Sequence, residues 1–157
     1  MPRKYDSPER FLKGDPKYGS RLVSKFVNSL MLKGKKTTAL KIFYDAMDMI
    51  EKRVKDVPPS EVFIQAVENV KPLIEVRSKR VGGATYQVPM EVKKSRQQAL
   101  AFRWILDAAR KKRGRPMARR LSDELYAAFN KEGEAINKRE VAHKMAEANK
   151  AFAHFAW

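Results

Sequence analysis

The sequence contains no cysteine and only two histidines. Without cysteine the chain can form no disulfide, no thiolate metal site and no cysteine nucleophile. His143 and His154 have no second histidine or acidic cluster at metal-ligand spacing beside them. The glycine pair Gly82-Gly83 also lacks the Gly-x-x-x-x-Gly-Lys pattern of a phosphate loop. We therefore expect no catalytic residue, no metal and no cofactor, and we predict that the chain is not an enzyme.

Long hydrophobic runs are missing as well. No apolar stretch reaches the length of a transmembrane helix, and the first residues, Met-Pro-Arg-Lys-Tyr-Asp, lack the apolar core of a signal peptide. We expect a soluble, cytoplasmic protein that has no membrane partner and does not form homo-oligomers. Hydrophobic residues nevertheless make up 43% of the 157 residues, which is enough for the core of a single domain.

Acidic residues are scarce relative to basic ones. There are 18 Asp and Glu against 34 Lys and Arg, and the formal net charge is +16. Such a surplus repels itself in a compact fold, and a polyanionic partner relieves the repulsion. Solubility alone requires far less charge. The composition therefore favours a nucleic-acid partner over a membrane surface or a charge without a partner.

The spacing of apolar residues predicts a mainly α single domain of about six helices. Residues 1–19, with several prolines and glycines, are expected to form an irregular basic N-terminal arm, followed by a helical domain over residues 20–157. Asn137 and Glu140 have the spacing of a capping box, which predicts that the last helix begins at Asn137. The other helices are expected to begin near Ser20, Thr37, Pro58, Lys93 and Pro116.

A protruding β-hairpin is expected at about residues 73–90, between the third and fourth helices. Gly82-Gly83 lies between β-branched stretches, and both positions of such a turn require a positive φ. A lone two-stranded ribbon is marginal in water, so we expect its outer half to be mobile until it binds a partner. The residues expected at the tip are Val81, Gly82, Gly83, Ala84 and Tyr86.

The sides of this hairpin are cationic. Arg77 and Lys79 alternate with apolar or small residues and so project from one face, and Arg80 follows them. The alternative is an edge hairpin that uses Lys and Arg to prevent aggregation. The glycine tip and the scarcity of acids favour RNA contact.

The densest positive charge lies between positions 110 and 120, where seven of eleven residues are basic and none is acidic. This cluster falls at a junction between two helices, and the backbone N–H groups that open the second helix favour phosphate. A charge run is more often a solvated face, but along the sequence this one is unrelieved, so we predict phosphate contact. The residues are Arg110, Lys111, Lys112, Arg113, Arg115, Arg119 and Arg120.

Two weaker basic patches leave contact and solvation equally open. One lies between the first two helices, and the other lies in the N-terminal arm, where three acids dilute it. Several separate basic surfaces suit a compact folded RNA better than one groove of a duplex. An architectural DNA-binding protein is the alternative, and an RNA-processing enzyme would need an acidic partner beside a histidine. The two patches consist of Lys33, Lys35 and Lys36, and of Arg3, Lys4, Arg10 and Lys17.

Several stretches of the chain are similar to those of a known protein family. The longest runs from Glu75 to Glu91 through the hairpin, and others run from Ala66 to Pro72 and from Met145 to His154. Over about residues 18–157, in order and without gaps, the sequence resembles the ribosomal protein seven family of the bacterial small subunit. The N-terminal arm departs from that pattern, because it has fewer arginines and carries acids.

The resemblance implies a helical core with a protruding β-ribbon. It implies direct, early binding to the 3′ major domain of the small-subunit rRNA, which nucleates folding of the head of the subunit. The ribbon cations and the glycine tip would lie at the exit site, near tRNA and mRNA. Ribosomal proteins of the head and the platform protein numbered eleven would be partners. Some members of the family also repress translation of their own operon, and the implied location is the ribosome in the cytoplasm.

Overall fold

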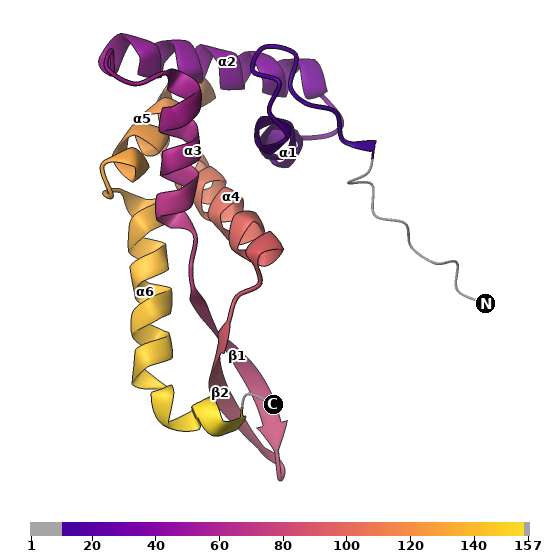
Figure 1. Cartoon of the computed structure of the whole chain (residues 1–157), viewed down its shortest axis with the longest axis vertical. Helices are drawn as coiled ribbons and strands as arrows, with labels where there is room; N and C mark the ends of the chain where they lie inside the picture. Colours follow the sequence, from indigo (N-terminus) through magenta and orange to yellow (C-terminus); the bar gives the residue numbers. More distant parts are fainter. Residues whose placement is uncertain (1–10, 156–157) are drawn as a thin grey trace, which may run out of the picture.

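The computed structural model describes residues 11–155, in which helices form a body and a two-stranded hairpin projects from it (Figure 1). This confirms the mainly α fold, with about six helices and the hairpin between the third and fourth. The elements are α1 (Arg21–Leu30), α2 (Lys36–Arg53), α3 (Pro59–Val70), β1 (Ile74–Val81), β2 (Ala84–Glu91), α4 (Lys94–Lys111), α5 (Met117–Phe129), α6 (Glu134–Ala148) and the 3-10 helix η2 (Lys150–Phe155).

Four phenylalanines from four helices meet at the centre of the body. The ring centroid of Phe26 in α1 lies 5.8 Å from that of Phe43, 5.1 Å from that of Phe63 and 5.2 Å from that of Phe102. The rings are tilted or edge-to-face, and each such pair adds about 0.5–1.5 kcal/mol to its burial. Helix α5 packs against α2, α3 and α4 around this cluster, so the helical body has one continuous core.

The described part of the N-terminal segment is irregular but anchored. The carboxylate of Asp15 accepts hydrogen bonds from the backbone N–H groups of Lys17 and Tyr18, at 3.1 Å each, and from the hydroxyl of Tyr44 at 2.9 Å. A Cβ at Gly14 would lie 2.3 Å from the carbonyl oxygen of Gly19, so only glycine fits there. Residues 11–20 are therefore held on α2. Arg3, Lys4 and Arg10 lie outside the described residues.

The ends of α5 and α6 are satisfied by side chains from other helices. Asn69 of α3 donates from Nδ2 to the carbonyl oxygens of Ala128 and Phe129, both at 3.0 Å, and so caps the C-terminus of α5. The first turn of α6 is capped by Glu124 of α5, whose Oε1 accepts from the N–H of Ala135 at 2.9 Å. These long-range caps tie α3 to α5 and α5 to α6.

The predicted start of the last helix is wrong. Helix α6 begins at Glu134, about one turn before Asn137, and Asn137 donates its backbone N–H to the carbonyl of Gly133. Gly133 occupies the N-cap position with a φ of 96°, which favours glycine. The cap supplied by Glu124 replaces the local capping box, and a local sequence pattern does not reveal a cap from another helix.

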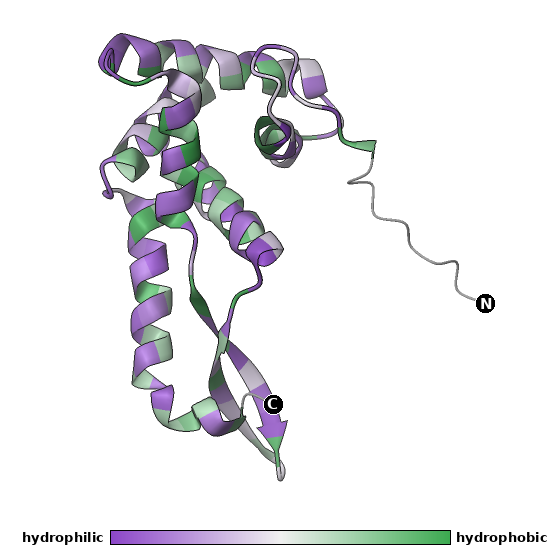
Figure 2. Cartoon of the chain, in the orientation of Figure 1, coloured by the Kyte–Doolittle hydropathy of each residue, from purple (hydrophilic) through white to green (hydrophobic). Residues whose placement is uncertain are grey.

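The hairpin runs antiparallel, with Arg77 opposite Val88 and Lys79 opposite Tyr86. Its turn has positive φ at both glycines, 58° at Gly82 and 88° at Gly83, as expected for this sequence. The hairpin was expected to stand alone, but in the structure other elements pack against it. Helix α6 runs alongside the hairpin and η2 contacts β2 (Figure 1). Most of α6 is hydrophilic, which agrees with a helix exposed along most of its length (Figure 2).

Candidate nucleic-acid interface

The seven basic residues between positions 110 and 120 lie at one corner of the body, which we call the α4–α5 corner. It comprises the end of α4, a short loop and the first turn of α5. The loop turns at Gly114, whose φ is 80°. No residue of the corner is acidic, but the fold brings carboxylates to it from α5 and α6.

Lys112 neutralises a carboxylate in the interior. Its Nζ lies 2.7 Å from Oε2 of Glu124, whose side chain is 0% exposed. The other oxygen of Glu124 caps α6, so this one side chain joins three elements. A buried carboxylate without a partner is strongly destabilising, and Lys112 therefore has a structural role. A Cβ at Gly133 would lie 3.0 Å from Glu124 Oε1, which is a second reason for glycine there.

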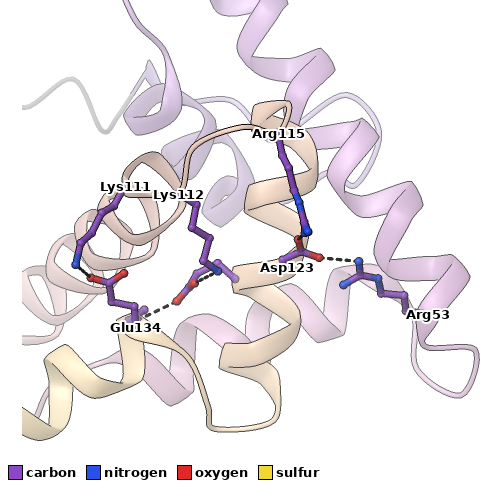
Figure 3. A network of polar contacts seen from close by, with 8 residues as sticks. Arg53, Lys111, Lys112, Arg115, Asp123 and Glu134 are labelled. Carbon is purple, nitrogen blue, oxygen red and sulfur yellow. Dashed lines mark hydrogen bonds and ion pairs between the residues drawn. The ribbon is translucent and has the colours of Figure 1, made fainter.

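Two further cations of the corner have acidic partners at the surface. Lys111 Nζ lies 2.6 Å from Glu134, and Arg115 lies 3.4 Å from Asp123, which also binds Arg53 at 2.6 Å. Figure 3 shows Arg53 and Arg115 converging on Asp123 from different elements. The hydrogen bond from Lys111 lowers the pKa of Glu134 and raises that of Lys111. The expectation that this charge is unrelieved is therefore wrong for Lys111, Lys112 and Arg115.

Two arginines of the corner close the C-terminal ends of helices. Arg110 donates from Nη2 to the carbonyl oxygen of Leu30 at 3.3 Å, at the end of α1. Arg120 donates to the carbonyl oxygens of Arg110, at 3.3 Å, and of Lys112, at the end of α4. Cationic side chains are favourable at helix C-termini, where carbonyl groups lack intrahelical partners. These two arginines thus hold the corner together.

Arg113 and Arg119 remain. Both are exposed, and neither side chain has a hydrogen bond or ion pair with any residue in 11–155. They flank the N-terminus of α5, where no side chain caps the helix and no acid lies in the first turn. The backbone N–H groups of Met117 and Ala118 have no acceptor in the described chain. Two arginines beside free N–H groups at the positive end of a helix can bind phosphate.

The ribbon cations are also partly engaged. Glu75 accepts from Arg77 at 2.6 Å and from Arg96 at 2.7 Å. Burial raises the pKa of Glu75, but the hydrogen bonds from Arg96 and Arg77 outweigh this and hold the pKa below its ordinary value. Lys79 donates to the carbonyl oxygen of Phe155 at 2.9 Å. Arg80 is exposed and has no side-chain partner within the described residues.

The register confirms that Arg77 and Lys79 share a face of the ribbon. That face also carries Val88, which is fully buried, and Tyr86. Since β1 packs against α6 and β2 against η2, the face is turned toward the C-terminal part of the chain. Arg80 projects from the opposite face.

A groove between α1 and α4 was not foreseen from the sequence. It has a volume of about 580 Å³, and its polar lining includes Lys25, Asn28, Gln98, Arg103 and Arg110. Arg103 is exposed and pairs with no side chain in residues 11–155. A signal was present, because Arg96, Arg103 and Arg110 are seven residues apart, which places them on one stripe of a helix.

The remaining predicted cations are scattered. Lys33 and Lys35 are exposed in the turn between α1 and α2, where Lys33 has a φ of 52°, and Lys36 is exposed at the first position of α2. None of the three forms an ion pair within the part of the chain that the structure describes. The turn follows the end of α1, whose last carbonyl oxygen accepts a hydrogen bond from Arg110 of the corner. The RNA contact of these three lysines stays a prediction.

The histidines have structural surroundings. His143 is partly buried on α6, and its Nε2 accepts a hydrogen bond from the backbone N–H of Leu73 at 3.1 Å. Burial and then the charge of Arg139 lower the pKa of His143. His154 is exposed in η2, and its Nδ1 lies 2.9 Å from the carbonyl oxygen of Ala151. Within residues 11–155 neither histidine is ion-paired with a carboxylate, and no cluster of potential metal ligands occurs.

None of the described helices is both long and apolar enough to cross a bilayer.

A helical body with a projecting ribbon and separate cationic surfaces defines a small RNA-binding protein of the kind found in ribonucleoprotein particles. The chain belongs to the family described as ribosomal protein S7p/S5e, whose model matches residues 2–150. Membership confirms the resemblance noted in the sequence, and it confirms the prediction of a ribosomal protein rather than an enzyme.

Curated relatives agree over nearly the whole length. The chain is 66% identical over 145 residues to small ribosomal subunit protein uS7 of Rhodopirellula baltica, an alignment that covers 92% of each chain. It is 57% identical over 155 residues to the protein of the same name from Nitratiruptor, and 55% identical over 155 residues to that from Thermotoga neapolitana. Both of these alignments cover 99% of each chain.

Proposed function

We propose that this protein binds the 3′ major domain of the small-subunit rRNA directly and nucleates the folding of the head. Its relatives are small ribosomal subunit proteins, and the protein has a structural role in that particle. The observation that supports the finer proposal is the pair Arg113 and Arg119 beside the uncapped N-terminus of α5.

The neighbours of this pair make it a fixed site. Lys112 ties the loop to the interior of the body, and Arg120 closes the end of α4. The loop that carries Arg113 therefore has little freedom to lose when phosphate binds, which favours affinity. Contacts of this kind position a protein on RNA without reading its sequence. The groove that contains Lys25 and Arg103 offers a second surface for the same rRNA.

We assign the ribbon to the exit site, near tRNA and mRNA, as the family resemblance implies. Arg80 and the side-chain-free tip at Gly82 and Gly83 are exposed, and the hairpin that carries them projects from the body (Figure 1). A narrow tip can approach an RNA backbone closely. Further partners in this proposal are the ribosomal proteins of the head and the platform protein numbered eleven. Repression of its own messenger would use the same phosphate contacts, on a messenger that folds like the rRNA site.

The test is a filter-binding titration with a transcript of the 3′ major domain. We expect the double charge reversal Arg113→Glu and Arg119→Glu to weaken binding about 100-fold, because two charge-assisted contacts are lost and two repulsions are added. The matched control, Lys41→Glu and Lys144→Glu, makes the same change in net charge at exposed positions without described ion pairs. It should weaken binding much less. Circular dichroism should show native helicity in both variants.

Two outcomes would contradict the proposal. Equal losses in both double variants would mean that net charge, not the α4–α5 corner, determines affinity. Equal affinity of the unmodified protein for the transcript and for random duplex DNA would favour an architectural DNA-binding protein. Chemical probing of the transcript with and without protein would then show whether binding also promotes its folding.

A further inference from the structure

The two faces of the ribbon differ in chemistry. One face carries Lys79 opposite Tyr86 and Arg77 opposite Val88. It therefore holds two of the three ribbon cations and the only aromatic ring of β1 and β2. The opposite face has Arg80 as its one cation. Single-stranded RNA is bound through aromatic rings that stack on bases and through cations that contact phosphates, so the first face is the better suited to RNA.

That face is covered by the C-terminal segment of the same chain. The ring of Tyr86 lies 5.4 Å from that of Phe152 and 5.1 Å from that of Phe155, with interplanar angles of 48° and 34°. Lys79 donates from Nζ to the backbone carbonyl oxygen of Phe155 at 2.9 Å. Figure 1 shows η2 folded back against the ribbon after the end of α6.

These contacts resemble those of a bound nucleotide. The phenylalanine rings occupy the side of Tyr86 where a base would stack, and a carbonyl oxygen takes the place of a phosphate oxygen on Lys79. We propose that the segment Lys150–Phe155 is a displaceable strap, which occupies the RNA-binding face of the ribbon in the free protein and leaves it when RNA binds. This inference rests on the proposed rRNA-binding function, and it takes the 3′ major domain as the RNA that this face of the ribbon binds.

The strap is held much less firmly than the helix that precedes it. None of the residues of η2 is buried. By contrast, α6 is fixed to the base of β1 by the hydrogen bond from Leu73 to His143, and its Ala146 is buried. Asn149 ends α6 and donates from Nδ2 to the carbonyl of Met145 at 2.7 Å. The chain can therefore pivot after Asn149 without disturbing α6.

Occupation by the strap has a consequence for affinity. RNA must compete with the strap for Lys79 and Tyr86. The apparent affinity of this face is therefore its intrinsic affinity multiplied by the fraction of molecules in which the strap has left the ribbon. A strap that instead oriented the ribbon for RNA would raise affinity. The sign of the effect on binding separates these two roles.

The experiment uses the full-length chain and the double variant Phe152→Ala and Phe155→Ala. Met145→Ala is the matched control, because it removes a large exposed apolar side chain from the neighbouring helix. Hydrogen–deuterium exchange of the free proteins should show faster exchange in β1 and β2 of the double variant only. The double variant should bind the transcript of the 3′ major domain about tenfold more tightly than the unmodified chain, since two ring contacts no longer compete.

Exchange of the unmodified protein with and without the transcript completes the test. RNA should slow exchange in the ribbon and speed exchange at residues 150–155. If RNA binds while exchange at 150–155 is unchanged or slower, or if the double variant binds more weakly, the strap proposal is overturned and the proposed rRNA binding stands. If the unmodified protein does not bind the transcript at all, the proposed function fails and the strap proposal fails with it.

Discussion

At the α4–α5 corner, Lys111, Lys112 and Arg115 each bond to a carboxylate, whereas the ribbon supplies a single partly buried carboxylate, Glu75, for its cations. One of these carboxylates, that of Glu124 in α5, is completely buried, and the ribbon has no carboxylate of that kind. Cations of the corner therefore hold the fold together and fix the backbone around two free arginines. Cations of the ribbon are restrained by contacts that another ligand can replace. A dense run of Lys and Arg is thus not by itself a binding surface.

The largest effect that we predict distinguishes two adjacent residues of the corner. Lys112→Gln leaves Glu124 buried without its ion-pair partner and should lower the free energy of unfolding by about 3 kcal/mol. Arg113→Gln removes an exposed side chain without partners and should change that free energy by no more than about 0.5 kcal/mol. Urea unfolding followed by circular dichroism measures both. Similar losses in the two variants would refute the division between structural and free cations.

A second prediction compares two glycines with similar backbone angles. Gly133 has a φ of 96° and Gly83 a φ of 88°, but a new Cβ would lie 3.0 Å from Glu124 Oε1 at Gly133 and would meet nothing within 4 Å at Gly83. Gly133→Ala should therefore cost about 2–3 kcal/mol, since backbone strain and crowding add. Gly83→Ala should cost about 1 kcal/mol, from backbone strain alone. Thermal and urea unfolding measure the loss of stability in each variant, and a larger loss in Gly83→Ala would contradict the prediction.

The smallest predicted effect is a loss of stability at acid pH, which involves His143 at the base of the ribbon. Burial and then Arg139 lower the pKa of His143 in the folded state. Between the folded and unfolded pKa values the unfolded chain binds more protons, so stability is lost as the pH falls below about 6.5. The hydrogen bond at stake, from the N–H of Leu73, contributes about 1 kcal/mol. The loss should be smaller in His143→Gln, which does not titrate, and unfolding measured between about pH 7 and pH 5 tests this.

Much of the fold could be predicted from the sequence, because helices and the hairpin leave local patterns. The paired glycines mark the turn, and the apolar spacing marks the helices. Contacts between distant parts of the chain could not be predicted. The cap that Glu124 supplies to α6 and the packing of Phe155 on Tyr86 depend on tertiary structure, and neither has a local signature.

Charge density along the sequence locates the candidate site. It does not show which of the basic residues stabilise the fold and which are free to bind phosphate. Nothing near position 112 in the sequence indicates that Lys112 will face a buried carboxylate, because Glu124 lies on the next helix. Arg103 was missed for a different reason. Its spacing from Arg96 and Arg110 is visible in the sequence. The groove that Arg103 lines forms only because α1 packs beside α4, and the sequence does not show that packing.

The salt dependence of rRNA binding tests the central claim most directly. The double variant Arg113→Gln and Arg119→Gln should reduce the slope of log affinity against log salt concentration by about 1.5, because two phosphate contacts are lost. Lys111→Gln and Arg115→Gln remove the same charge from side chains bonded to carboxylates, and they should leave the slope close to that of the unmodified protein. An unchanged slope in the first pair, or an equal reduction in both, would contradict the account.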